Sequence, residues 1–257
     1  MRTLRLYWSK SKPNFGDALS PLMCERLAGC PVVFADRWRC DLVALGSLLD
    51  RFREWYPHPR VHVWGTGFIE ARPPRRGRFH YHAVRGRLSA GIIQGPSIDA
   101  FGDPGLLVGV LWPELKKTPK RHRVGLVPHY EDRIDPRVVA LRNSLPGCVV
   151  VDVFGEVMEV LREIAACECI FSSSLHGLVV ADAFGVPNAW VKFSEKVRGS
   201  GFKFHDYYSI YGPDLPAVPL SPEQLDAARI GAVHEQYARP GLDQIKNRLL
   251  TAFPFKP

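Results

Sequence analysis

Short apolar runs separated by amphipathic segments recur along the second half of the chain, and this periodicity predicts alternating strands and helices. The predicted strands span residues 124–127, 149–154, 169–171 and 189–193. The predicted helices span residues 136–145, 156–167 and 175–184. Strands and helices that alternate in this way form a parallel sheet covered by helices on both faces. The second half is therefore predicted to be a Rossmann-like lobe.

The first half of the chain contains similar apolar runs. The strands predicted from them span residues 4–8, 32–34, 42–45, 61–64 and 79–84. A helix is predicted over residues 18–27, where four apolar side chains recur at helical spacing. Residues 112–123 are basic and interrupted by prolines, a composition typical of a linker. We therefore predict an α/β protein with two Rossmann-like lobes, residues 1–115 and 116–215, followed by a C-terminal helical tail, residues 216–257.

Polar residues fall at several of the predicted strand ends. Ligands of open parallel sheets bind beyond the carboxyl ends of the strands. Two such lobes joined by a linker predict an active site in the cleft between them. The candidates at these ends are Asn14–Asp17, Gly65–Gly67 and Arg85 in the first lobe, and His129 and His176 in the second.

The segment Ser172–Gly177 carries the strongest signal of a binding site. It lies where a predicted strand ends and a predicted helix begins, with Gly185 and Pro187 after the far end of that helix. A helix N-terminus presents unpaired N–H groups and a partial positive charge, so it can bind an anion. His176, in the first turn, adds a titratable donor. The alternative is an ordinary capped helix with a packed or solvated histidine.

The charge balance narrows the choice of partner. The net charge of +8 and the pI of about 9.3 favour a phosphorylated substrate, an anionic membrane surface or nucleic acid. No helix-turn-helix, RNP or zinc motif accompanies the arginines, which disfavours nucleic acid. With no signal peptide and no run of 18 apolar residues, we expect a cytoplasmic protein. The six cysteines lack C-x-x-C spacing, so we expect reduced thiols, Cys167 and Cys169 buried, and no zinc site.

Two further residues are candidates for the chemistry itself. Arg85 follows an apolar run and precedes Gly86, and its guanidinium can pair with a carboxylate or a phosphate in a bidentate way. Asp17 can act as a general acid or base near acceptor hydroxyls. The alternative for Asp17 is a structural one, the N-cap of the helix predicted over 18–27.

Three other polar residues have two interpretations each, and for His129 and Lys203 the interpretation without a role in binding is favoured. Asn14 can orient a substrate or simply shape the turn before the first helix. His129 can face the cleft or play a structural role at its strand end. Lys203 can neutralise a phosphate or lie on the surface.

These segments, in their order and spacing, resemble the polysaccharide pyruvyltransferase family over roughly residues 4–212. The matching segments are Asn14–Asp17, Trp64–Phe68, Val84–Gly86, Gly102–Pro104, Val127–His129, Ser173–Gly177 with Ala181–Pro187, and the aromatic-basic stretch Phe202–Tyr208. The resemblance implies a GT-B-like pair of lobes, phosphoenolpyruvate as the donor, and a lipid-linked or polymeric sugar of a surface polysaccharide precursor as the acceptor. It also implies that the first lobe is the acceptor side and the second the donor side.

The expected site follows from these interpretations. We expect His176 and Asp17 to be catalytic. The expected substrate-binding residues are Arg85, Asn14, Ser173, Ser174, Leu175, Gly177, His129 and Lys203. No metal or cofactor is expected, because cationic side chains can clamp the donor's anionic groups. The basic charge predicts peripheral contact with the inner face of an anionic membrane. Two alternatives remain: a GT-B-type glycosyltransferase with a nucleotide-sugar donor, and a non-catalytic docking subunit of polysaccharide assembly.

Overall fold

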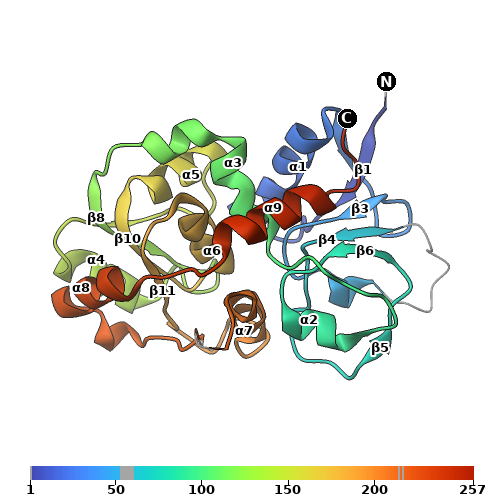
Figure 1. The fold of residues 1–257 in the computed structure, drawn as a ribbon. Coiled ribbons are helices and arrows are strands. Elements are labelled where there is room, and N and C mark those ends of the chain that lie inside the picture. Colours follow the sequence, from blue (N-terminus) through green and yellow to red (C-terminus); the bar gives the residue numbers. More distant parts are fainter. Residues whose placement is uncertain (1, 53–60, 214, 216) are drawn as a thin grey trace. The chain divides into compact units, whose positions relative to one another are not determined.

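The computed structural model describes residues 2–52, 61–213, 215 and 217–257, and these form two compact units (Figure 1). The first unit comprises Met1–Leu107, Gly201–Pro216 and Pro240–Pro257. The second comprises Val108–Ser200 and Ala217–Arg239. The chain thus returns twice to the first unit after leaving it. The lobe ranges 1–115, 116–215 and 216–257, and the GT-B-like arrangement with its cleft, stay predictions.

The first unit is built on a five-stranded parallel sheet in the order β2-β1-β3-β4-β6. Its strands are β1 (Leu4–Tyr7), β2 (Val32–Phe34), β3 (Leu42–Val43), β4 (His62–Trp64) and β6 (His80–Ala83). A separate parallel pair joins β5 (Arg75–Arg76) to β7 (Ile93–Gln94). The helices are α1 (Phe15–Ala28), α2 (Arg87–Ile92), α7 (Phe202–Tyr208) and α9 (Leu242–Ala252).

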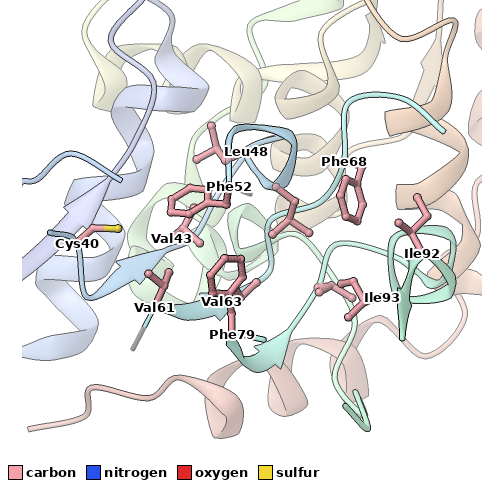
Figure 2. Packing of buried hydrophobic residues seen from close by; sticks show 12 residues of the cluster. Cys40, Val43, Leu48, Phe52, Val61, Val63, Phe68, Phe79, Ile92 and Ile93 are labelled. Carbon is pink, nitrogen blue, oxygen red and sulfur yellow. The ribbon is translucent and has the colours of Figure 1, made fainter. Parts of the chain in front are cut away.

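The core of the first unit is an apolar cluster contributed by the sheet and the segments that follow its strands (Figure 2). Val43 and Val63 come from neighbouring strands, and Phe52, Phe68 and Phe79 pack with them. The Phe52 and Phe79 rings meet edge to face, with centroids 5.9 Å apart. This packing fixes the sheet, and with it the positions of the loops at the carboxyl ends of the strands.

The second unit contains a four-stranded parallel sheet in the order β11-β10-β8-β9. Its strands are β8 (His122–Val127), β9 (Cys148–Val150), β10 (Cys167–Ser172) and β11 (Asn188–Trp190). Its helices are α3 (Val108–Leu111), α4 (Pro136–Ser144), α5 (Val157–Ala165), α6 (Leu175–Phe184) and α8 (Ala227–Gln236). The Rossmann-like, parallel α/β fold class predicted from the sequence is therefore confirmed for both units.

Both sheets reverse their winding direction in the same way. In each, the first strand lies between the second and the third, so the strand order changes direction between β1 and β3 and between β8 and β10. The loops that leave the two strands at such a point go to opposite faces of the sheet and open a crevice at its carboxyl edge. Each unit therefore has one point where such a crevice is expected, and we refer to the loops at that point as the crevice of the unit.

Several element boundaries differ from the sequence prediction. Helix α1 begins at Phe15 instead of residue 18, because Asn14 caps it. Strand β9 ends at Val150, before a turn in which Phe154 N donates to Asp152 Oδ1. The segment interpreted as a linker contains a 3-10 helix, Pro113–Lys117, and the first residues of β8. Helices α2 and α7 were not predicted, and the tail predicted to be helical contains a 3-10 turn, Pro222–Gln224, before α8.

Candidate functional site

The crevice of the second unit brings together the two segments singled out on its strand ends. Strand β8 leads to His129, and strand β10 leads to Ser173 and Ser174. The Ser173 and Ser174 N–H groups donate to the carbonyl oxygen of Val127, over 3.2 and 3.3 Å. In return, His129 N donates to Ser173 Oγ over 2.8 Å. These reciprocal bonds hold the β8 loop against the start of α6.

A buried carboxylate, Asp132, joins three strand ends in this unit. Asp132 is 1% exposed. Its Oδ2 accepts a hydrogen bond from Ser173 Oγ over 2.7 Å, and its Oδ1 accepts one from Ser194 Oγ. Ser173 follows β10 and Ser194 follows β11, whereas Asp132 follows β8. Asp132 and Ser194 were not predicted from the sequence, although both lie within a few residues of predicted strand ends, where polar side chains are a signal of a site.

The N-terminus of α6 is built without a side-chain cap. Ser174 occupies the N-cap position with extended φ and ψ angles of −94° and 129°, but within the described chain its hydroxyl makes no hydrogen bond to the helix. Ser172 Oγ instead accepts from Ser174 N over 3.0 Å. First-turn N–H groups have no intrahelical partner, so this helix start can receive the oxygens of an anion.

Gly177 allows α6 to start this close to the sheet. A Cβ atom on Gly177 would lie 2.3 Å from Ser172 Oγ and 2.8 Å from Val127 Cγ1. Leu175 is buried in the same turn, and His176 is half-buried. The predicted residues Ser173, Ser174, Leu175, His176 and Gly177 therefore form one structural element.

The ring of His129 is oriented by its own loop. Glu131 N donates to His129 Nδ1 over 3.3 Å, and the His129 and Tyr130 rings lie with their centroids 4.1 Å apart. A neutral imidazole that accepts at Nδ1 carries its proton on Nε2. His129 is half-buried, so both its structural role and a role in binding are compatible with this geometry.

The crevice of the first unit holds the other predicted catalytic residue. Asn14 caps α1: its Oδ1 accepts from Asp17 N over 3.0 Å, and its Nδ2 donates to Asp17 Oδ2 over 2.6 Å. The alternative in which Asp17 itself caps the helix is therefore wrong. A Cβ atom on Gly46, in the loop after β3, would lie 3.6 Å from Asp17 Oδ1. The carboxylate thus lies beside the β3 loop at the point where the strand order changes direction.

Arg85 is placed at the carboxyl end of β6 and is completely buried. Its Nε donates to Asp206 Oδ2 over 2.9 Å, its Nη1 donates to Ser47 Oγ over 2.6 Å, and its Nη2 donates to the Phe68 carbonyl. The guanidinium is thus bonded to groups of its own unit on three nitrogens. Direct binding of a substrate anion by Arg85 stays a prediction.

Lys203 lies on α7, three residues before Asp206. Its side chain is 7% exposed, and its Nζ lies 5.3 Å from the centroid of the Phe204 ring. The alternative in which Lys203 lies on the surface is therefore wrong. The first unit thus holds Asn14, Asp17, Arg85 and Lys203.

The polar groups present in these sites are hydroxyl, amide, imidazole, carboxylate, guanidinium, ammonium and backbone groups. In the described ranges, no group of three or more His, Cys, Asp or Glu side chains has the geometry of a metal site. Cys167 and Cys169 are buried, as predicted, and burial raises the pKa of each thiol to about 12, which makes them poor nucleophiles.

Over the residues that the structure describes, no helix is both long and apolar enough to cross a lipid bilayer.

Two parallel α/β units with polar strand-end loops define a protein of the Rossmann-like class. The sequence profile described as polysaccharide pyruvyl transferase matches residues 10–194. The chain therefore belongs to the polysaccharide pyruvyl transferase family, and the resemblance found in its motifs is confirmed.

Two relatives give this membership a context. The succinoglycan biosynthesis protein ExoV of Rhizobium meliloti is 30% identical over 210 residues, which are 80% of this chain and 64% of ExoV. The uncharacterized protein L143 of Acanthamoeba polyphaga mimivirus is 24% identical over 212 residues, which are 77% of this chain and 71% of that protein. The chain thus spans about two thirds of the length of these relatives.

Proposed function

We propose that this protein transfers a pyruvyl group from phosphoenolpyruvate to a sugar of a surface polysaccharide precursor, as a cyclic ketal. The observation that carries the proposal is the structure at the start of α6. The Ser174 side chain does not cap the first turn of this helix, and that turn contains His176. The buried Asp132 holds the segment in place through its hydrogen bond from Ser173. Membership of the polysaccharide pyruvyl transferase family, and similarity to the succinoglycan biosynthesis protein ExoV, support the same reaction class.

The donor's phosphate fits the α6 N-terminus. A phosphate needs several N–H or cationic donors that converge on it, and the positive end of a helix dipole adds to their attraction. The first-turn backbone of α6 supplies the N–H groups, with Ser174 and His176 as side-chain donors. Ser173 is already engaged with Asp132 and His129, so its role is to fix the loop.

The reaction balances with two acceptor hydroxyls and no other reactant. A proton is added to the CH2 carbon of phosphoenolpyruvate, and the first sugar oxygen bonds to C2. The C2–O bond to phosphate then breaks, with the electron pair leaving on the phosphate oxygen, and the second sugar oxygen bonds to C2. Of the two protons lost by the hydroxyls, one ends on the new methyl group and the other on phosphate.

These reaction steps need a general acid or hydrogen-bond donor at the departing phosphate and a general base at the acceptor hydroxyls. We assign the first role to His176, which lies in the first turn of α6. We assign the second to Asp17, whose orientation is fixed by Asn14. Lys203 adds positive charge to the unit that holds Asp17. Arg85, the predicted anion-binding residue of the same unit, also holds α7 in place through Asp206.

The acceptor is a lipid-linked or polymeric sugar, which the enzyme reaches from the cytoplasm. The net charge of +8 favours weak, salt-sensitive attraction to an anionic membrane face, without insertion. Co-sedimentation with anionic vesicles at low and high salt tests this part. Binding that persists undiminished at high salt would contradict an electrostatic attraction.

The decisive experiment compares two classes of donor. Phosphoenolpyruvate is expected to raise the melting temperature of the protein, whereas nucleotide-sugars are not, because a ligand stabilises only the state that binds it. Incubation with phosphoenolpyruvate and lipid-linked sugars is expected to release phosphate and to add a pyruvate-sized mass to the acceptor. A shift with a nucleotide-sugar and none with phosphoenolpyruvate would instead favour a glycosyltransferase.

A further inference from the structure

A cavity of about 600 Å³ lies in the first unit, at the edge of its sheet and away from the point between β1 and β3 where the strand order changes direction. Strand β6 is the edge strand, and it lines the cavity with Tyr81 and His82. Helix α9 lines it with Asn247, Arg248 and Thr251. The segment before the 3-10 turn at residue 104 contributes Ser97, Asp99 and Ala100. Cavities of this volume hold ligands of small-molecule size.

Two oppositely charged side chains, Arg248 and Asp99, line the cavity, and among the described residues they do not form an ion pair with each other. Arg248 is exposed, and within the described chain it makes no ion pair and no hydrogen bond. Asp99 is exposed as well, and its Oδ1 accepts a hydrogen bond from Ser97 Oγ over 3.2 Å. The side chains of Asn247 and Thr251 add neutral donors and acceptors to the same wall. A guanidinium and a carboxylate are thus both available to one ligand.

We propose that this cavity is a saccharide-binding site for neutral hexose units, separate from the site of pyruvyl transfer. Vicinal hydroxyls both donate and accept, so they can satisfy a carboxylate and a guanidinium together, each in a charge-assisted bond. The Tyr81 ring and the methyl groups of Ala100 and Ala252 supply apolar surface for the C–H face of a sugar ring. A phosphate is disfavoured, because the Asp99 carboxylate would repel it.

This inference deepens the proposed function, on which it rests for the identity of the acceptor as a polysaccharide precursor. Strands β3 and β4 separate β1 from β6. Neighbouring strands lie about 4.8 Å apart, so the edge cavity is on the order of 15 Å from the crevice that holds Asp17. A polymeric acceptor held in the cavity would present its other sugars at a raised local concentration, whereas a monosaccharide would gain nothing.

The test measures binding to arrayed neutral and phosphorylated oligosaccharides. Wild-type protein is expected to bind neutral hexose oligosaccharides, and Arg248→Ala and Asn247→Ala are each expected to weaken that binding about tenfold, as loss of a charged or bidentate hydrogen bond does. Gln244→Ala is the matched control, because Gln244 is exposed on α9 and does not line the cavity. Circular dichroism melts establish that each variant is folded.

The outcomes separate this inference from the proposed reaction. Array binding that survives in His176→Ala but falls in Arg248→Ala supports a separate saccharide site, whether or not phosphoenolpyruvate is turned over. No binding by the wild type, a preference for phosphorylated glycans, or equal binding by the wild type and the two cavity variants would each overturn it. Turnover of phosphoenolpyruvate without array binding would remove only the saccharide site and leave the proposed function in place.

Discussion

The Arg85 guanidinium and the Asp206 carboxylate form an ion pair, with Nε and Oδ2 2.9 Å apart, in which both side chains are fully excluded from solvent. Asp206 also accepts from Ser89 N over 2.7 Å and from Ser89 Oγ over 2.6 Å. Arg85 reaches Ser47 and Phe68 from the other side of the pair. The pair therefore ties α7 to α2 and to the loops after β3, β4 and β6.

Breaking this pair is expected to be costly. Asp206→Asn leaves the Arg85 charge buried without a counter-charge, and removal of one partner of a buried pair costs about 3–5 kcal/mol in unfolding free energy. Urea denaturation measures the change. The matched control is Glu195→Gln, which breaks the Lys192–Glu195 pair, 2.7 Å long but with side chains 41% and 85% exposed. There the expected change is within about 0.5 kcal/mol. Equal stability of the two variants would mean that the buried pair carries little of the fold.

The second prediction concerns the close approach of α6 to its sheet. Gly177→Ala places a Cβ atom 2.3 Å from Ser172 Oγ, and neither Ser172 nor Val127 can move without disturbing buried strands. We expect a loss of about 1–3 kcal/mol, as overpacking produces. Gly231→Ala is the control, because Gly231 lies in α8 with nothing within 4 Å of the added atom. That change is expected to stabilise the helix by about 0.5–1 kcal/mol. A stable Gly177→Ala protein would show that α6 can shift away from the sheet.

Local signals explain how much of this fold the sequence could predict. Helix α6 was predicted at its observed bounds, because the serines before it and Gly185 after it are both local signals, and Gly185 does adopt a left-handed φ of 70°. Helix α7 was missed, because Phe202–Tyr208 is rich in aromatic residues and is buried on most sides, so no polar face marks it as a helix.

Contacts that are distant in sequence could not be predicted in this way. Arg85 could be identified from the sequence as a candidate for anion binding, but its partner Asp206 lies 121 residues further along the chain. Asp132 is similar, because its carboxylate matters only once β10 and β11 bring Ser173 and Ser194 beside it. The candidate strand ends were therefore identified from the sequence, but not the buried carboxylates that support them.

The third prediction concerns pH. His62 Nδ1 and His82 Nε2 lie 2.7 Å apart on neighbouring strands, and the His80 ring stacks on His62. Burial, reinforced by the neighbouring histidines His62 and His80, lowers the pKa of His82 to about 4. Burial and His80 also lower the pKa of His62. A histidine in the unfolded chain has a pKa of about 6.5, so below that pH the unfolded state binds more protons than the folded state.

Stability from these histidines is therefore complete above about pH 6.5 and is lost as the pH falls toward 4. Urea melts between pH 5 and 7.5 are expected to show unfolding free energy rising with pH. His82→Asn is expected to flatten this dependence, whereas His234→Asn, an exposed position on α8, is expected to leave it as in the wild type. An unchanged slope in His82→Asn would assign the pH dependence to other groups.

The fourth prediction tests the support beneath the proposed donor site. Asp132→Asn keeps the shape of the side chain, but it replaces a charge-assisted acceptor of two serine hydroxyls with a weaker one. We expect the KM for phosphoenolpyruvate to rise about tenfold, as the loss of a hydrogen bond to a charged group does. Asp152→Asn is the control, since Asp152 also accepts a turn hydrogen bond after a strand, but at β9 and in an exposed position. A KM that changes equally in both variants would remove Asp132 from the donor site.

The last prediction concerns His176, for which we expect the largest effect on turnover. Its position in the first turn of α6 places the imidazole beside the N–H groups proposed to receive the phosphate, where it can donate a proton or a hydrogen bond to the leaving oxygen. His176→Ala is expected to lower kcat about 100-fold or more, the range that a general acid contributes. His176→Gln keeps a hydrogen-bond donor, so its phosphoenolpyruvate binding is expected to exceed that of the alanine variant.

Steady-state kinetics with phosphoenolpyruvate and a lipid-linked sugar, beside circular dichroism melts, measures both effects. The control is His234→Ala, which removes an exposed histidine of the same unit and is expected to leave kcat unchanged. Both His176 variants are expected to remain folded, because the side chain is half-buried at a helix start and not part of the apolar core. Near-normal turnover in a folded His176→Ala protein would return His176 to a structural role. The departing phosphate would then have to be stabilised by the α6 backbone alone, with Asp17 as the remaining titratable candidate for proton transfer.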